Sequence, residues 1–177
     1  LIMRLFLSWK HIISLCFVLL HLSLSNAAVT KEQHRLLIIN SYNEGAPWSQ
    51  TLINPIMLQT SSIEDVSADL VHINGTFIRN DSLYNQMEEG IFQRYENNKP
   101  DYLVLIGSIA FTLRDRIQKE WGDIPMVLIA NEDTYAPQGY YFTGRSINMT
   151  DNKALPLNDL REQYNFTFIE APDMYKE

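Results

Sequence analysis

Residues 35–40 read RLLIIN, a short apolar run in which apolar and polar positions do not alternate. Two further runs have the same character, YLVLI at 102–106 and MVLIA at 126–130. Strands that are buried on both faces read this way, because helices cover both sides of a parallel sheet. Weaker runs at 68–73 and 166–169 add two strands, and we expect the run at 68–73 to lie nearer an edge.

Helical patterns occupy the segments between these runs. In one of them, apolar residues recur every four positions from Leu83 to Tyr95, which places them on one helix face, and Asp81 or Ser82 can cap its start. We expect four helices, at about 47–60, 81–97, 108–120 and 157–163. The alternation of strands and helices predicts an α/β fold with a doubly wound parallel sheet and right-handed crossovers.

The residues that follow each strand are the candidates for a binding site. Doubly wound sheets bind ligands in the crevice beyond the carboxyl ends of their strands. The loops after the apolar runs at 35–40, 102–106 and 126–130 offer hydroxyl, aromatic, amide and carboxylate side chains, which suit a small polar ligand. Our candidate ligand-binding residues are Ser41, Tyr42, Trp48, Gly107, Ser108, Asn131 and Glu132.

Each loop also has a purely structural interpretation. Trp48 could cap the hydrophobic core from an ordinary loop, and Ser108 could serve only as the N-cap of the following helix. The segment that contains Asn131 and Glu132 could be a solvated loop. We expect His72 to be a strand residue at the rim of the sheet and neither a ligand contact nor a base.

Composition excludes several classes of protein. The 177 residues are 46% hydrophobic, which excludes a disordered or collagen-like chain. Fourteen Lys and Arg residues stand against 21 Asp and Glu residues, for a formal net charge of −7, so we expect no nucleic-acid partner. A single cysteine excludes a disulfide scaffold and a zinc site with several thiolates.

The first 27 residues have the order of a secretory signal peptide. Arg4 and Lys10 precede the apolar run at 12–24, and Ser25 and Ala27 supply small residues before a cleavage site. The apolar core of about 13 residues is short for a bilayer span of about 20, and an uncleaved membrane anchor is the alternative. We therefore expect an exported protein that lies on the periplasmic face.

Motifs of the common cofactor and nucleotide sites are absent from the sequence. No Gly-x-Gly-x-x-Gly follows the first strand, and no phosphate-binding P-loop, nucleophile elbow or His-Glu-x-x-His occurs. We therefore expect a chain that is not an enzyme and that carries no cofactor and no metal. An exported enzyme on a flavodoxin-like fold is the least favoured of our hypotheses.

Several short motifs together resemble a known family. The segment from Ile39-Asn40-Ser41-Tyr42 to Pro47-Trp48 resembles the opening of a bacterial family related to periplasmic binding proteins. Pro100-Asp101 and Asp123-Ile124-Pro125 resemble the entries of that family to later strands. The resemblance covers about residues 33–177. The family includes solute-binding proteins of ABC transporters and extracytoplasmic sensor domains of histidine kinases. This chain resembles most the sensor region of hybrid two-component histidine kinases.

The resemblance implies a type I periplasmic-binding-protein-like lobe, with the flavodoxin-like three-layer αβα arrangement. It implies a signal peptide or anchor at 1–27, an N-terminal sensor lobe at 33–150, and a crossover with the start of a truncated second lobe at 151–177. The function implied is ligand sensing for signal transduction by a two-component system. A periplasmic solute-binding protein of an ABC transporter is the alternative.

The same resemblance implies the partners. These are a small-molecule solute, a missing second lobe, a kinase core linked through the inner membrane, and a second copy in a homodimer. We expect the chain to be a fragment of such a longer protein, because Pro172-Asp173 and the residues after it read as the start of a helix.

Overall fold

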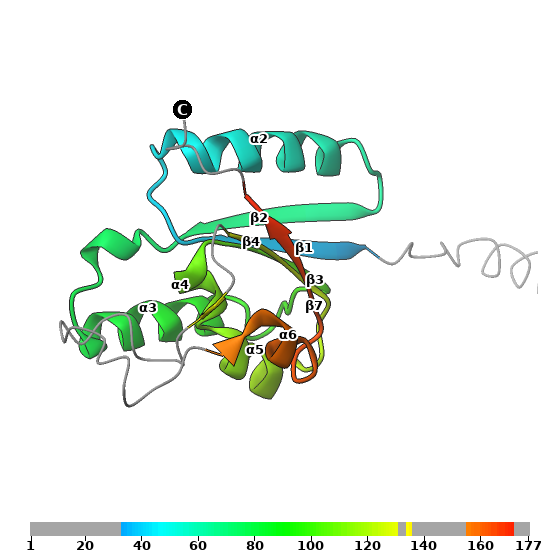
Figure 1. Ribbon diagram of the computed structural model, residues 1–177. Coiled ribbons are helices and arrows are strands. Elements are labelled where there is room, and N and C mark those ends of the chain that lie inside the picture. Colours follow the sequence, from blue (N-terminus) through cyan, green and yellow to red (C-terminus); the bar gives the residue numbers. More distant parts are fainter. Residues whose placement is uncertain (1–32, 131–133, 136–154, 172–177) are drawn as a thin grey trace, which may run out of the picture. The chain divides into compact units, whose positions relative to one another are not determined.

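Five parallel strands form one sheet in the order β2-β1-β3-β4-β7. Their bounds are β1 (His34–Asn40), β2 (Val66–His72), β3 (Tyr102–Ile106), β4 (Met126–Ala130) and β7 (Phe166–Glu170). The computed structural model describes residues 33–130, 134–135 and 155–171 (Figure 1). All five predicted strands are confirmed, and the run at 68–73 does belong to a strand at an edge of the sheet.

The strand order defines where the chain changes direction across the sheet. From β1 the chain first moves outward to β2, and it then returns to the other side of β1 and adds β3, β4 and β7 in turn. Asn40, the last residue of β1, pairs with His72 of β2 and with Ile106 of β3. The carboxyl ends of β1, β2 and β3 therefore lie next to one another, and we call this side of the sheet its carboxyl edge.

Helices cover both faces of the sheet (Figure 1). Helix α2 (Pro47–Ser61) lies on one face, and α3, α4, α5 and α6 lie on the other. Their bounds are α3 (Asp81–Arg94), α4 (Ser108–Phe111), α5 (Arg114–Trp121) and α6 (Leu157–Arg161). The three-layer α/β arrangement that the sequence predicts is therefore present in the described residues.

The helices differ from their predicted form in two places. The single helix expected at 108–120 is two helices, α4 and α5, separated at Thr112 and Leu113. The Thr112 hydroxyl donates to the carbonyl of Ile109 at 2.6 Å, a local bond that competes with regular helix. The cap of α3 is Asn80 and not Asp81 or Ser82, because the Asn80 side chain accepts from the backbone N–H of Leu83 at 2.9 Å.

Three short elements complete the described chain. A 3-10 helix, η1 (Gly75–Phe77), follows β2, and a small antiparallel pair joins β5 (Thr134–Tyr135) to β6 (Leu155–Pro156). The sequence predicts none of these elements, since each has only two or three residues and shows no periodicity.

Two apolar clusters form the core, one on each face of the sheet. Alternate residues of a strand point to opposite faces, so Leu37 belongs to one cluster and Ile38 to the other. The larger cluster lies between the sheet and α3, α4 and α5, and it contains the fully buried Phe111. The smaller one lies beneath α2 and includes Ile53, with Trp48 packed against it.

No helix within the described ranges is long and apolar enough to cross a membrane.

Candidate functional site

Ser41, Tyr42 and Gly107 meet where β1 and β3 end. The backbone N–H of Ser41 donates to the carbonyl of Ile106 at 2.8 Å, which continues the pairing of the two strands for one more residue. Gly107 has a φ of +83°, and a Cβ atom there would lie 2.8 Å from Ser41 Oγ and 3.0 Å from Tyr42 Cε2. The loops after β1 and β3 are therefore in close contact at this edge, as the strand-end argument predicts.

The loop after β2 reaches the same edge. The backbone N–H of Gly75 donates to the carbonyl of Ser41 at 2.9 Å. A Cβ atom on Gly75 would overlap Cδ1, the far end of the Ile109 side chain, and would lie 3.2 Å from the carbonyl oxygen of Ser41, so glycine lets this loop lie close to both. No local pattern marks Gly75, because its neighbour Ile109 lies 34 positions later in the chain.

A hydroxyl from the β1 loop caps helix α4. Ser41 is buried, and its Oγ accepts from the backbone N–H of Ala110, the third residue of α4, at 2.8 Å. The N-cap position itself belongs to Gly107, which has no side chain, and Ser108 is the first helical residue. The interpretation of Ser108 as the N-cap is therefore wrong, because Ser41, which lies 69 positions before Ala110, supplies the capping oxygen.

We expect Ser41→Ala to lower the free energy of unfolding by about 1–2 kcal/mol, since it leaves a buried N–H at the start of α4 without an acceptor. Ser108→Ala is the matched control, and we expect it to change stability by less than about 0.5 kcal/mol. Urea denaturation followed by circular dichroism measures both. Equal losses in the two variants would contradict the assignment of the cap to Ser41.

Tyr42 and Trp48 form an aromatic pair beside this contact. Their ring centroids are 5.0 Å apart with an angle of 68° between the planes, an edge-to-face arrangement. Tyr42 is 39% exposed, while Trp48 is half-buried and also packs against the apolar cluster beneath α2. Trp48 thus contributes to the core and at the same time presents an aromatic surface to Tyr42.

Asn40 holds the loop that carries the aromatic pair. Its side chain is fully buried, and its Oδ1 accepts from the backbone N–H of Tyr42 at 3.3 Å. Its Nδ2 lies 3.3 Å from the carbonyl of Tyr42, 3.2 Å from Ser49 Oγ and 2.9 Å from His72 Nδ1. Asn40 is not among the predicted site residues, although an amide at the end of a buried apolar run is a signal that could have identified it.

Three predicted site residues remain: Ser108, Asn131 and Glu132. Ser108 is half-buried at the same edge, one residue after Gly107. Asn131 and Glu132 lie outside the described residues. Among the residues that the structure does describe, no group of three or more His, Cys, Asp or Glu side chains could hold a metal ion. Hydroxyl, amide and aromatic groups therefore set the chemistry of the described part of the site.

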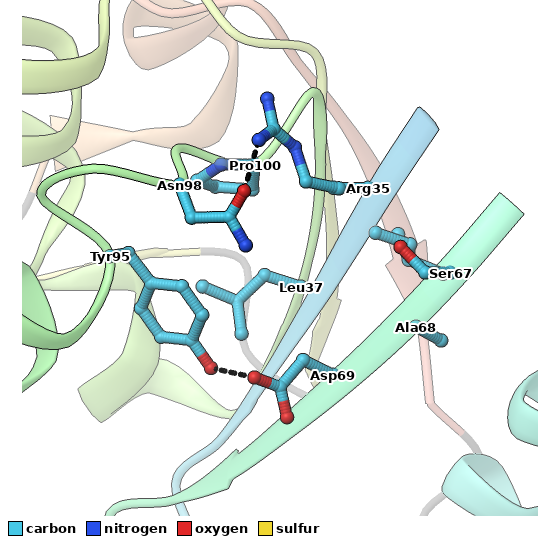
Figure 2. A pocket seen from close by; sticks show the side chains of 9 residues that line it. Arg35, Leu37, Ser67, Ala68, Asp69, Tyr95, Asn98 and Pro100 are labelled. Carbon is cyan, nitrogen blue, oxygen red and sulfur yellow. Dashed lines mark hydrogen bonds between the residues drawn. The ribbon is translucent and has the colours of Figure 1, made fainter. Parts of the chain in front are cut away.

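A hollow lies at the opposite end of the strands from these residues, between β1, β2 and the end of α3. Figure 2 shows it, with Tyr95 directed at Asp69 and Arg35 directed at Asn98. The cavity measures about 200 Å³. Asp69 accepts from the Tyr95 hydroxyl at 2.5 Å and pairs with Arg94 at 3.0 Å.

These bonds give the hollow a structural role. They join the edge strand β2 to the end of α3 through groups that already have partners. Burial raises the pKa of Tyr95, and the neighbouring Asp69 raises it further, so the phenol stays protonated and continues to donate. We therefore interpret this hollow as a tie between β2 and α3 and not as a binding site.

A charged cluster joins α3 to α5 in a similar way. The Arg116 guanidinium lies 2.7 Å from Glu89 and 2.7 Å from Glu120, and 3.4 Å from the buried Glu88. Burial raises the pKa of Glu88, an effect that outweighs the opposing influence of Arg116. Because the Arg116 side chain is shared among three carboxylates, the cluster is a link between two helices and not a free anion site.

Comparison with protein-family models, with curated proteins and with solved structures found no match for this chain. The fold and the geometry of the strand ends are therefore what characterise it. They define an α/β chain with a parallel sheet in which the candidate residues Ser41, Tyr42 and Gly107 meet where the strand order reverses.

Proposed function

We propose that this chain is a solute-sensing domain, or part of one, that acts outside the cytoplasm in a two-component sensor histidine kinase. In finer terms, we propose that it is the first lobe of a type I periplasmic-binding-protein-like sensor. The observation that carries the proposal is the contact of Ser41, Tyr42 and Gly107 at the point where the strand order reverses. In open α/β sheets this is the place where ligands bind.

The side chains at the carboxyl ends of the strands suit the binding of a small polar solute. Tyr42 and Trp48 offer apolar ring surface with polar tips, and Ser108 offers a hydroxyl. Helix α2 begins at the same edge with no acidic residue in its first turn and no side-chain cap. Its first N–H groups therefore favour electron-rich ligand atoms such as hydroxyl or carbonyl oxygens.

The mechanism follows from a site that one lobe only partly encloses. A solute on Tyr42 and Trp48 would also contact a second lobe of the parent protein, and that contact would favour the closed arrangement of the two lobes. Differential affinity for the closed arrangement shifts the population toward it. The parent protein would transmit this shift to its kinase core.

The expected result of removing the aromatic surface is a loss of solute binding. We expect Tyr42→Ala and Trp48→Ala each to weaken binding by about tenfold or more, since aromatic anchors contribute strongly to binding sites. The measurement is calorimetric titration of the full-length protein with neutral sugars, amino acids and small carboxylic acids. Tyr102→Ala is the matched control, because Tyr102 is 45% exposed at the opposite end of the strands.

Two results would contradict the proposal. One is the absence of binding by every solute in the panel, and the other is unchanged affinity in both aromatic variants. The coding sequence beyond residue 177 distinguishes the sensor from the transporter alternative. A membrane segment and a kinase core there would support the sensor, whereas a stop after a second lobe would favour a solute-binding protein.

A further inference from the structure

Helix α2 carries no charged side chain. In the sequence, no Asp, Glu, Lys or Arg occurs anywhere between Glu44 and Glu64, a stretch that includes the whole of α2. The other long helices differ, since five of the eight residues of α5 and four of the fourteen residues of α3 are charged. A helix on the surface of a globular protein normally places charged side chains on its outer face, so the lack of charge in α2 needs an explanation.

The sheet beneath α2 shows the same separation of charge. The charged residues of the five strands are Arg35, Asp69 and Glu170, and successive strand residues point to opposite faces. Asp69 pairs with Leu37, and Glu170 pairs with Ala130. Leu37 and Ala130 belong to the apolar cluster on the side of α3 and α5, and Arg35 is two positions before Leu37. The face of the sheet that α2 covers therefore has no Asp, Glu, Lys or Arg among its strand residues.

The outer face of α2 is uncharged and partly apolar. Pro47, Thr51, Pro55 and Leu58 are exposed and follow one another at intervals of three or four residues, so they form one line along the helix, which we call the α2 stripe. Leu58 is 74% exposed, and Ile63 just after the helix is 52% exposed. Among the described helices, α2 alone lies on its side of the sheet (Figure 1). None of the other described helices covers the stripe.

These properties are those of the centre of a protein interface. Depletion of charged residues is the compositional feature that distinguishes the centre of an interface from the rest of a protein surface. The exposed Leu58 side chain adds apolar area that a partner would remove from water. The α2 stripe therefore differs from the charged outer faces of α3 and α5 in the way that an interface differs from ordinary surface.

The charge of the chain favours a second copy as the partner. Each copy has a formal net charge of −7, so two copies repel each other wherever their charged surfaces meet. Contact through the α2 stripe places no like charges opposite one another. A two-fold contact needs the same patch on both copies, and an uncharged stripe is complementary to itself. We propose that α2 is the contact between two copies of this chain, packed stripe against stripe about a two-fold axis.

The size of the stripe indicates a weak dimer. At 1.5 Å per residue the helix is about 22 Å long, too short to bury by itself the roughly 800 Å² per partner of a standard interface. Packed helices commonly cross at about 50°, which keeps Glu44 and Glu64 beyond the ends of the stripe apart from their counterparts. We expect a dissociation constant on the order of 10–100 µM. If the proposed sensor function holds, attachment of both copies to one membrane would raise their effective concentration enough for this contact to form.

The first measurement is the salt dependence of association. Analytical ultracentrifugation of the full chain from about 5 µM to about 1 mM is expected to show a monomer–dimer equilibrium. Raising the NaCl concentration from about 20 mM to about 500 mM is expected to tighten the dimer about threefold or more, because salt screens the repulsion between two acidic copies. An interface held by ion pairs would respond in the opposite direction.

The second measurement introduces charge into the stripe. We expect Leu58→Lys to weaken the dimer by about tenfold or more, since it places an unpaired charge from each copy in the contact. Thr51→Lys on the same stripe is a second variant with the same expected effect. Leu83→Lys is the matched control, because Leu83 is an exposed leucine of α3, on the other side of the sheet, and we expect it to associate as the wild type does. Circular dichroism checks that each variant is folded.

The third measurement locates the contact. In a Cys16→Ser background, a spin label at Asn54→Cys reports the distance between the two copies, because Asn54 is exposed next to Pro55 on α2. Packed helix axes are about 8–10 Å apart, so we expect a distance below about 25 Å between the labels. Labels at Asn85→Cys on α3 are expected to lie more than about 40 Å apart, since two sheets would separate them.

Four results would overturn the proposal. The first is a chain that stays monomeric up to about 1 mM, which would favour another part of the parent protein as what covers α2. The others are a dimer that salt weakens, unchanged association in both Leu58→Lys and Thr51→Lys, and a short distance between labels at Asn85→Cys. None of these measurements uses a solute. A failure here therefore leaves the binding proposal standing, and an empty solute panel leaves the dimer contact standing.

Discussion

Gly107→Ala is expected to lower the free energy of unfolding by about 3 kcal/mol, because it combines backbone strain with overlap of side-chain atoms. Gly107 has φ +83° and ψ 163°, a conformation that only glycine adopts without strain. The added Cβ would lie 2.8 Å from Ser41 Oγ and 2.9 Å from Ser41 Cβ. Ser41 cannot easily yield, because its hydroxyl caps α4 through the N–H of Ala110.

Gly90→Ala is the matched control for this substitution. Gly90 lies within α3, and a Cβ there would have nothing within 4 Å. Alanine is the better helix former, so we expect a gain of up to about 1 kcal/mol. Urea denaturation measures both variants, and a Gly107→Ala protein as stable as the wild type would show that the β1 and β3 loops are not in the contact described.

Phe111→Ala is expected to cost about 3–5 kcal/mol, the range for removing a buried aromatic side chain. Phe111 is fully buried in the larger apolar cluster, and its ring centroid lies 5.0 Å from that of Phe166. The Arg114 guanidinium lies 5.1 Å from the same ring. The substitution therefore leaves a cavity between the helix layer and β7 and also removes an aromatic contact from a buried cation.

Phe77→Ala is the control for the loss of an aromatic ring as such. Phe77 is 66% exposed in η1, so we expect a change within about 0.5 kcal/mol. Thermal and urea unfolding of the two variants give the comparison. Similar effects in both would contradict the assignment of Phe111 to the core.

Local sequence patterns were sufficient for the elements of the sheet. The runs at 102–106 and 126–130 match β3 and β4 to the residue, because a strand buried on both faces is an apolar run with sharp polar ends. The helix bounds were predicted less closely, since the helix expected at 108–120 is two helices. The break between α4 and α5 depends on the bond of Thr112 to the chain before it and on the burial of Leu113, neither of which interrupts the apolar periodicity.

The candidate site was predicted in part. Ser41, Tyr42 and Gly107 were selected because they follow strands, and they do lie together at the edge of the sheet. Asn40 and His72 were predicted only as strand residues, although Asn40 also lies in the segment that carries the family resemblance. Their importance depends on a bond between residues 32 positions apart, which no local pattern contains.

The sequence by itself determined that this chain alternates strands and helices, that its sheet is parallel, and that polar and aromatic candidate residues follow the strands. These properties follow from the spacing of apolar residues along the chain, which is a local quantity. Only the tertiary structure decided that β1 lies between β2 and β3. That neighbourhood is what brings Ser41 to the start of α4 and His72 to Asn40, because pairing between distant strands is set by how their faces pack and not by periodicity within any one of them.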